Sequence, residues 1–279
     1  MTHSMDDNAR DFTEFFSRHL IGLCWYEGPV DVNGDFTETP AFRCASGFLL
    51  QVEDRFCLVT AGHVLADIND RLRKNGHVAK QHSLFDIWSP RSTVKERIPF
   101  DFTDAETPVL EYQPELGIDI AVIELPELYL KMLSQTIEPF THERWIHQHN
   151  VAFDFYAILG IPGEAAVQEI KRNSVTTFPD PQVIFVEAAP LVAADDANTP
   201  LPQFFGKILP GDPVGDIAGT SGGPILGFRK NDKGQLHYWP VAVQSRWRAR
   251  SRTITGTSLP HFALALHEWL ASQPEHKAR

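Results

Sequence analysis

The pattern of apolar and polar positions predicts a chain built mainly of short β-strands. Between residues 21 and 125, short apolar runs are separated by Pro, Gly, Asn and Asp, and the same pattern returns between residues 151 and 256. Short apolar runs between turn residues are typical of strands. Asp6 to Leu20 and Pro260 to Ser272 instead place their large apolar residues at helical spacing. We therefore expect two β-rich regions flanked by terminal helices.

Two further helices are predicted inside the chain. Leu65, Ile68 and Leu72 are spaced as one face of a short helix that follows His63. Residues 127–133 form a second helical pattern between the two β-rich regions. We expect both helices to be short interruptions of a β-structure.

A polar stretch with several histidines follows the second of these helices. It contains His142, His147 and His149. Imidazoles are common metal ligands, but no acidic residue or cysteine stands at a fixed spacing from these histidines. We expect a solvated linker here, and neither a metal nor another cofactor.

A serine among glycines, Gly219-Thr220-Ser221-Gly222-Gly223-Pro224, is the strongest chemical signal in the chain. Glycine lacks the Cβ that blocks close approach, so such a turn presents a hydroxyl and backbone N–H groups to one point. The Ser221 hydroxyl would attack a carbonyl carbon. The N–H groups of Gly219 and Ser221 would form an oxyanion hole, in which each donor contributes about 3–4 kcal/mol.

A serine nucleophile needs a base and a group that orients the base. His63 follows an apolar run at a Gly-His turn, which would hold its imidazole at the end of a strand. Asp119 stands at the start of another apolar run. Burial beside a histidine would let this carboxylate fix the imidazole tautomer and stabilise the imidazolium. His63 is thus the candidate base and Asp119 the candidate orienting group.

The order His63, Asp119, Ser221, together with the local sequence around each residue, resembles the chymotrypsin-like (trypsin-like) serine peptidases. The resemblance covers most of the chain and is strongest to the bacterial branch that includes the HtrA proteases. It implies an all-β fold of two packed antiparallel six-stranded β-barrels, with peripheral N- and C-terminal helices and the active site between the barrels.

The resemblance also divides the chain. It implies an N-terminal helical extension at 1–20, a first barrel with His63 and Asp119 at 21–135, a crossover linker at 136–150, a second barrel with Ser221 at 151–258, and a C-terminal helix and tail at 259–279. We therefore expect no PDZ-like domain after the second barrel, unlike in complete HtrA proteins.

Two residues depart from the animal digestive enzymes of this family. Thr220 stands where those enzymes carry an aspartate that receives a new N-terminus, and Val64 stands where they carry a disulfide-forming cysteine. Activation by that ion pair is therefore not expected. We expect restraint of the protease to come from narrow specificity, or from an oxyanion loop that only a substrate or a regulatory protein partner orders.

Composition excludes several other classes of function. No stretch approaches the roughly 20 apolar residues of a membrane helix, and the first residues lack the features of a signal peptide. We therefore expect a cytoplasmic protein without membrane contact, unless a precursor segment has been removed. The net charge of −11 argues against nucleic-acid binding. Cys24, Cys44 and Cys57 match no zinc pattern and are predicted to be free, buried thiols.

The segment after the nucleophile resembles the family strand that pairs with an extended peptide substrate. It contains Ser245, Arg246 and Trp247, and by resemblance Ser245 contacts Asp119. If the strand continues, Arg246, Arg248, Arg250 and Arg252 share one face and would favour acidic substrates, or would pair with the carboxylates of this protein. Asp216 is a candidate specificity residue for a basic side chain, unless it pairs with one of these arginines.

The sequence favours a serine endopeptidase that acts on protein or peptide substrates through an acyl-enzyme. The alternative is a protease-like peptide-binding module that is latent or inactive. An α/β-hydrolase is a third hypothesis, because Gly219-Thr220-Ser221-Gly222-Gly223 fits its G-x-S-x-G pattern. Two features oppose this hypothesis: an apolar strand, not a helix, follows the motif, and the histidine precedes the serine in the chain.

Overall fold

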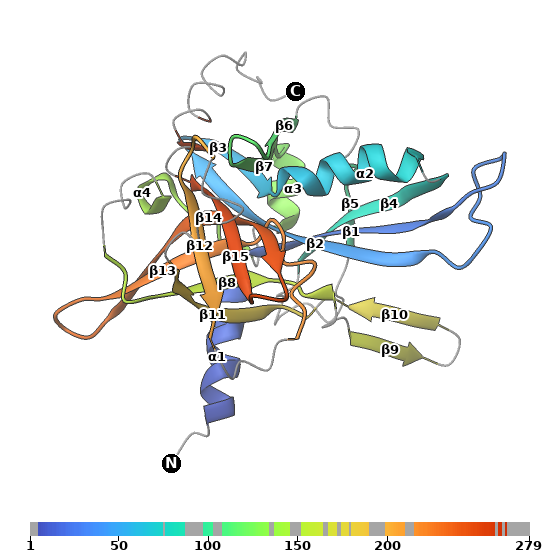
Figure 1. The fold of residues 1–279 in the computed structure, drawn as a ribbon. Coiled ribbons are helices and arrows are strands. Elements are labelled where there is room, and N and C mark those ends of the chain that lie inside the picture. Colours follow the sequence, from blue (N-terminus) through green and yellow to red (C-terminus); the bar gives the residue numbers. More distant parts are fainter. Residues whose placement is uncertain are drawn as a thin grey trace.

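The structure is a computed structural model of the 279-residue chain. It describes residues 5–74, 76–86, 97–102, 108–133, 137–145, 152–163, 167–171, 174–178, 180–189, 199–209, 215–259, 262, 263 and 266. Within these ranges the chain forms two lobes, each built around an antiparallel sheet (Figure 1).

The first lobe is a seven-stranded antiparallel sheet with the strand order β5-β4-β1-β2-β3-β7-β6. Its strands are β1 (Leu20–Pro29), β2 (Ala41–Val52), β3 (Arg55–Thr60), β4 (His77–Asp86), β5 (Arg97–Pro99), β6 (Pro108–Gln113) and β7 (Ile118–Glu124). The long strands β1 and β2 extend as an arm beyond the rest of the lobe (Figure 1). The inner residues of β1, β2, β3 and β7 are almost fully buried.

This lobe differs from the predicted six-stranded barrel because its sheet stays open among the described strands. Helix α2 (Gly62–Lys74) supplies the physical reason, since it packs against β4 near one edge of the sheet and against β6 and β7 at the other. Ala61, Val64, Leu65 and Ile68 are buried there in one apolar cluster with residues of the sheet. The helix predicted after His63 therefore forms, and it fills the seam where a barrel would close.

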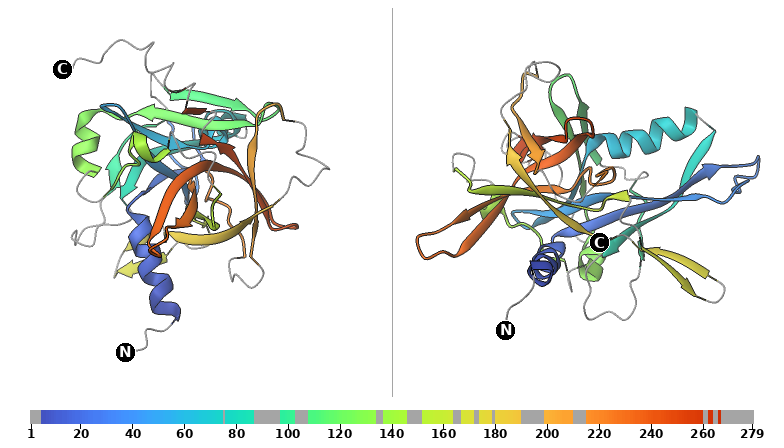
Figure 2. Two further views of the ribbon diagram at one scale, coloured as in Figure 1. Left: turned by 90° about the vertical axis from the view of Figure 1, so that its left-hand side faces the viewer. Right: turned by 60° about the horizontal axis from the view of Figure 1, so that its bottom comes forward.

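The second lobe is a closed six-stranded barrel, as predicted, with the order β11-β12-β15-β14-β13-β8. Its strands are β8 (Phe155–Gly160), β11 (Gln182–Ala188), β12 (Gln203–Ile208), β13 (Pro224–Lys230), β14 (Leu236–Arg248) and β15 (Thr253–Ser258). A separate hairpin of β9 (Val167–Lys171) and β10 (Ser174–Phe178) projects away from the barrel in both Figures 1 and 2.

The N-terminal helix α1 (Met5–Ser17) precedes the first lobe in sequence but packs on the second. Phe12 lies 5.6 Å from Phe185 of β11 and 5.7 Å from Phe228 of β13, measured between ring centroids. Phe16 is buried, whereas Phe15 remains 45% exposed. The predicted aromatic stripe thus forms a core contact, and it joins the start of the chain to the far lobe.

The helix predicted at residues 127–133 is present as α3 (Glu127–Leu133), and a short helix α4 (His142–Trp145) follows it. Leu259, Phe262, Ala263 and Leu266, from the predicted C-terminal helix, are buried in the largest apolar cluster with residues of both lobes. The rest of that predicted helix lies outside the described residues. No helix in the described ranges is long and apolar enough to cross a membrane.

Candidate active site

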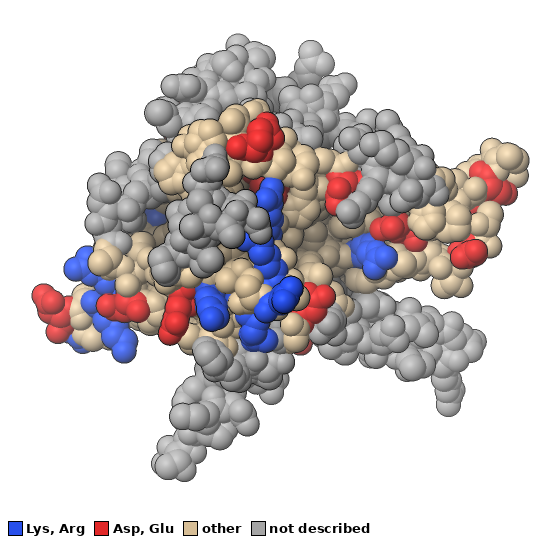
Figure 3. All heavy atoms as spheres, viewed as in Figure 1, with Lys and Arg blue, Asp and Glu red and all other residues tan. Residues whose placement is uncertain are grey.

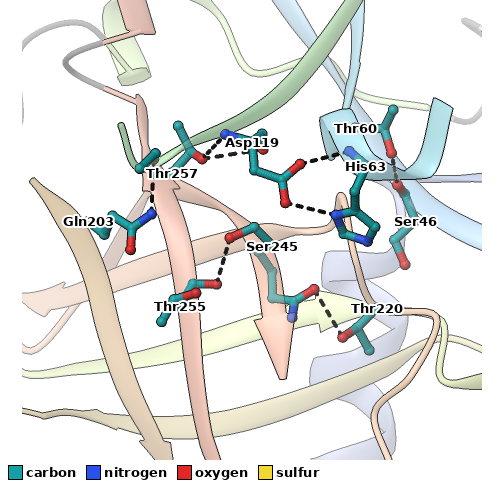
Figure 4. A network of polar contacts seen from close by, with 11 residues as sticks. Ser46, Thr60, His63, Asp119, Gln203, Thr220, Ser245, Thr255 and Thr257 are labelled. Atoms are coloured by element: carbon teal, nitrogen blue, oxygen red, sulfur yellow. Dashed lines mark hydrogen bonds and ion pairs between the residues drawn. The ribbon is translucent and has the colours of Figure 1, made fainter. Parts of the chain in front are cut away.

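His63 and Asp119 form a tightly paired unit at the meeting point of the two lobes (Figure 4). His63 opens helix α2 directly after β3, and Asp119 lies in β7, which pairs with β3. His63 Nδ1 lies 2.8 Å from Asp119 Oδ2, and the His63 backbone N–H donates to Asp119 Oδ1 at 2.8 Å. Because the carboxylate only accepts hydrogen bonds, Nδ1 carries the proton in neutral His63. The other nitrogen, Nε2, is then free to act as a base.

The Asp119 side chain is 4% exposed and that of His63 is 24% exposed. The aspartate is therefore shielded from water while the imidazole edge stays accessible. Such a carboxylate keeps the imidazole in one tautomer and orientation and stabilises the imidazolium that forms during proton transfer.

The backbone of Asp119 is held by Thr257 of β15, which sequence reasoning missed. The Asp119 N–H donates to Thr257 Oγ1 at 2.9 Å, and this hydroxyl donates to the Asp119 carbonyl at 3.2 Å. The contact joins the second lobe to the orienting residue of the first. The two residues are 138 positions apart in the sequence, so no local pattern indicates their contact.

Ser245, which the resemblance places against Asp119, forms no hydrogen bond with it in the described part of the chain. Its buried hydroxyl lies 3.3 Å from the Thr255 carbonyl, to which it donates. A bulge between Gln244 and Arg246 shifts the register of β14 at this position. In this chain Thr257 rather than Ser245 holds Asp119.

The nucleophile candidate Ser221 ends a short turn, residues 217–221, which we call the oxyanion turn. The Thr220 N–H donates to the Ile217 carbonyl at 3.0 Å, and Gly219 has a φ of 101°. The Gly163 N–H holds the Ala218 carbonyl at 2.6 Å. The C=O and N–H of a trans peptide point in opposite directions, so the Gly219 N–H faces away from Gly163.

The N–H groups of Gly219 and Ser221 form no hydrogen bond within the described residues. Both residues line one pocket with His63. Two unused donors and a serine hydroxyl beside an imidazole are the components that acyl transfer requires.

Gly222 explains why the motif needs a second glycine. Its φ is 90°, and a Cβ built there would lie 2.1 Å from Thr60 Oγ1 and 2.2 Å from the Ser46 carbonyl oxygen. Only glycine fits this left-handed position so close to the first lobe. The motif is thus shaped by contact between the lobes.

The pocket beside His63 and Ser221 has a volume of about 210 Å³. The first lobe supplies most of its other walls, including Trp25, Glu27 and Asp67. A second pocket of about 280 Å³ lies on the other side of Gly219 and is lined by Arg43, Gly163 and Ala218, among others. No hydrogen bond joins Ser221 to His63 in the described structure. Contacts of this kind are commonly longer without substrate and tighten in the complex.

Thr220 occupies the position where the family resemblance expects a charged aspartate. It is fully buried, and its hydroxyl lies 2.9 Å from the Ile217 carbonyl and 3.3 Å from Gln244 Oε1. The turn is closed here by neutral groups. Nothing at this position requires a newly formed, charged N-terminus.

The predicted substrate-binding residues on β14 differ in their surroundings, and the arginine stripe does not extend beyond this strand. Trp247 packs against the core of the second barrel, while Arg246 and Arg248 are half-buried on β14. Arg250 and Arg252 do not continue the strand, because β14 ends at Arg248 and both residues lie in the turn that follows, where Arg252 has a φ of 53°. The predicted four-arginine stripe is therefore wrong beyond its first two members.

Asp216 is half-buried, and its carboxylate accepts the Ala218 N–H at 3.0 Å. It forms no ion pair with an arginine among the described residues. The structure places Asp216 at the entry to the oxyanion turn, where it caps the backbone. It lines neither of the two pockets beside Gly219.

The remaining candidate groups are structural. The three cysteines are free thiols, as predicted, and burial raises the pKa of Cys57 to about 12. No group of three His, Cys, Asp or Glu residues in the described ranges is arranged to hold a metal ion. His147 and His149 lie outside those ranges.

The surface has no single sign of charge. On the face in Figure 3, Lys and Arg gather over the second barrel, whereas Asp and Glu are more frequent over the arm of the first lobe. On this face the two signs of charge therefore differ in frequency between the two lobes. A charged peptide laid across both lobes would meet different fields at its two ends.

Comparison with solved structures identifies the fold as that of the chymotrypsin-like serine proteases. The thermostable serine protease AL20 from an extremophilic microorganism is similar with a TM-score of 0.50 and 14% identity, over 93% of this chain and 99% of that one. The scabies mite inactivated protease paralogue S-I1 is similar with a TM-score of 0.50 and 11% identity, over 94% of this chain and 97% of that one.

No protein-family model and no curated protein sequence matches the chain. At such low identities the structural likeness defines the fold alone, and the fold is shared with an inactivated protein. It excludes an α/β-hydrolase, because the sheets are antiparallel and the serine turn leads into strand β13, not into a helix.

Proposed function

We propose that the protein is a serine endopeptidase with Ser221 as nucleophile, His63 as general base and Asp119 as orienting group. One observation carries the proposal. The doubly hydrogen-bonded His63–Asp119 pair opens onto the same pocket as Ser221 and Gly219, whose N–H groups are unused in the described structure.

The proposed reaction follows from these positions. The Ser221 oxygen attacks the peptide carbonyl carbon while its proton passes to His63 Nε2. The resulting oxyanion accepts hydrogen bonds from the N–H groups of Gly219 and Ser221. Collapse breaks the C–N bond, and His63 gives its proton to the leaving amine. A water molecule then repeats the sequence on the acyl-enzyme, which releases the acid and restores Ser221.

The substrate would be an extended peptide that adds to β14 through its backbone, with Ser245, Arg246 and Trp247 on the contacting strand. Arg246 and Arg248 on this strand would favour acidic side chains in the substrate, with pairing to carboxylates of this protein as the alternative. Narrow specificity of this kind is the restraint that we propose for the protease, with a regulatory protein partner as the alternative. Asp216, which caps the oxyanion turn, is not needed for this preference.

The closer relationship to the bacterial branch and a cytoplasmic location remain part of the proposal. Thr220 and Val64 are the residues that support the bacterial branch. The three free cysteines are consistent with a reducing compartment.

A fluorophosphonate probe tests the proposed function directly. We expect the probe to label the wild-type protein at Ser221, located by peptide mass spectrometry, and to leave Ser221→Ala unlabelled. Asp119→Asn should lower kcat by about 10⁴, because the imidazole then adopts the wrong tautomer. Ser251→Ala, a change of an exposed serine outside the site, is the matched control and should be labelled as wild type. Equal labelling of wild type and Ser221→Ala would exclude the proposed nucleophile.

A catalytically latent peptide-binding module is the second candidate function. The missing hydrogen bond between Ser221 and His63 favours it, as does a fold shared with an inactivated protease paralogue. Binding of peptides without labelling or cleavage would support this second function.

A further inference from the structure

We propose that Ser46 is a positioning residue that, together with Thr220 and Gln244, holds the oxyanion turn in its donor-presenting form before any substrate binds. This inference rests on the proposed function and concerns how the same site is kept competent. On this proposal the fold itself orders the oxyanion turn, and no partner is needed to order it.

Ser46 lies in β2 of the first lobe and is fully buried. Its hydroxyl donates to the Gly219 carbonyl at 3.0 Å and accepts the Ile161 N–H at 2.9 Å. Its own N–H donates to the Ser221 carbonyl at 3.1 Å. One side chain and one peptide group therefore connect the first lobe to both ends of the Gly219–Ser221 segment and to the end of β8.

The Ser46 backbone is itself fixed from behind. Thr60, at the end of β3, donates its hydroxyl to the Ser46 carbonyl at 2.7 Å. Figure 4 shows Thr60 and Ser46 side by side next to His63. The strand that leads to the general base thus also supports the residue that holds the oxyanion turn.

Two peptide planes meet at Gly219, and each has its carbonyl held. The Ala218 carbonyl accepts from Gly163, and the Gly219 carbonyl accepts from Ser46. Since each peptide is planar, fixing a carbonyl also fixes the N–H at its other end. Reversing the first plane would turn the Gly219 N–H out of the oxyanion hole, and the contacts with Gly163 and Ser46 oppose that reversal.

Thr220 and Gln244 hold the interior side of the same turn. The Thr220 hydroxyl has a single hydrogen, which it gives to the Ile217 carbonyl at 2.9 Å. Gln244 Nε2 is buried without a hydrogen-bond partner among the described residues, while its Oε1 lies 3.3 Å from Thr220 Oγ1. Exchanging the two ends of the amide makes Gln244 the donor to Thr220, and we assign that orientation because it relieves the clash of two acceptors.

The Gln244 backbone completes the support. Its carbonyl accepts the Gly222 N–H at 2.8 Å, and its N–H donates to the Gly223 carbonyl at 2.9 Å. All of these contacts are between neutral groups. Among the described contacts of the turn, the Asp216 carboxylate that accepts the Ala218 N–H is a charged group. The contacts that Ser46, Thr220 and Gln244 make with the turn require neither a new N-terminus nor an ion pair.

Three variants test the assignment with one matched control. Ser46→Ala and Thr220→Val each remove one hydroxyl from the support with little change in volume, and Thr220→Ser restores the hydroxyl. Ser17→Ala is the control, because Ser17 is also fully buried and donates to a backbone carbonyl, Thr13, at 2.7 Å, but it lies in α1.

We expect Ser46→Ala and Thr220→Val to lower kcat by roughly 10- to 100-fold, part of the 10²–10³-fold effect of losing an oxyanion donor, with KM changed by no more than about twofold. Such a split indicates loss of transition-state stabilisation. Thr220→Ser should recover most of kcat, and Ser17→Ala should keep both constants. Unchanged kcat in Ser46→Ala and Thr220→Val would overturn the proposal, as would equal losses in Ser17→Ala.

Hydrogen exchange provides a readout that does not need activity. In Ser46→Ala and Thr220→Val, peptides covering residues 215–224 should exchange about tenfold faster than in wild type and in Ser17→Ala. If the wild type neither cleaves peptides nor reacts with the probe, the proposed function fails while this comparison still decides the role of Ser46. Unchanged exchange in both variants would contradict that role.

Discussion

His19 is a buried histidine whose neutral form is built into the contact between α1, the first lobe and β14. Its Nδ1 lies 2.7 Å from the Glu138 carbonyl, its Nε2 lies 2.8 Å from the Tyr238 hydroxyl, and its ring stacks on Phe140. The pKa of His19 is lowered from 6.5 to about 3, chiefly by burial and to a smaller extent by Arg18 and Arg144, although the hydrogen bond with the Glu138 carbonyl opposes the shift. The folded protein therefore excludes a proton that the unfolded chain binds.

This pKa predicts a loss of stability in mild acid. Above pH 6.5 His19 is neutral in both states and costs nothing. As the pH falls from 6.5 toward 3, the unfolded state takes up the proton first, so the free energy of unfolding decreases. At pH 5 the loss is about 2 kcal/mol, because one pKa unit corresponds to about 1.4 kcal/mol.

Urea unfolding at pH 7.5 and pH 5 measures this effect. His19→Gln should be less stable than wild type at pH 7.5, but its free energy of unfolding should change about 2 kcal/mol less between the two pH values. An identical pH dependence in wild type and variant would show that His19 does not take up the proton.

At the scale of single residues, sequence reasoning named the proposed reacting groups but not the residues that hold them. His63, Asp119 and Ser221 each stand in a local pattern that reveals them, namely a turn or the end of an apolar run. Thr257 and Ser46 stand in ordinary strand patterns. Their roles arise only because the lobes bring them against the Asp119 backbone and the oxyanion turn.

Among the elements, the docking of helix α1 leads to a specific prediction about the stability of two phenylalanine variants. Phe16 is 2% exposed and its ring lies 5.3 Å from that of Phe228 and 4.8 Å from that of Tyr238, whereas Phe15 is 45% exposed and lies under the Arg18 guanidinium. Phe16→Ala should destabilise the protein by about 3–5 kcal/mol, the usual loss for a buried phenylalanine. The neighbouring Phe15→Ala should cost about 1 kcal/mol.

Urea titrations of Phe16→Ala, Phe15→Ala and the wild type at one pH measure the free energies of unfolding to be compared. Equal losses for the two variants would mean that α1 does not dock through its Phe16 face. A loss in Phe16→Ala without loss of probe labelling at Ser221 would separate the support of the fold from the chemistry.

Element boundaries were predictable where the pattern was local. The helix at Glu127–Leu133 has the bounds that its spacing indicates, and α2 follows His63 as expected. The predicted arginine stripe is wrong beyond Arg248 because β14 ends there in a turn, which the alternation of residues in the sequence does not reveal. A strand's end depends on its neighbours in the sheet, and those neighbours are distant in sequence.

At the scale of the molecule, the active site depends on how the two lobes dock. Contacts across the lobes include the Ser46 N–H to the Ser221 carbonyl, the Ser46 hydroxyl to Ile161, and Thr257 to Asp119. These contacts surround the triad, and none of them involves a formal charge. The site is therefore assembled by the fold, without an ionic latch.

This arrangement predicts indifference to the chemical state of the N-terminus. Addition of a short Gly-Ser segment before Met1 should leave kcat/KM and the labelling rate within about twofold, because Thr220 offers no buried carboxylate to an α-amino group. The unextended protein is the control in the same assay. A tenfold or larger loss would show that the N-terminus helps to form the site.

The sequence by itself determined the β-rich class, the order of the three reacting residues and the glycines of the turn, because each of these depends on residue type and near neighbours. Only the tertiary structure decided that α2 leaves the first sheet open, that Thr257 holds Asp119, and that Ser46 reaches Gly219. Gly222 illustrates the division: its identity is visible in the sequence, but its reason is the Thr60 hydroxyl and the Ser46 carbonyl of the other lobe. Hydrogen bonds and steric limits between distant segments leave no periodic trace in a chain, so they appear only when it is folded.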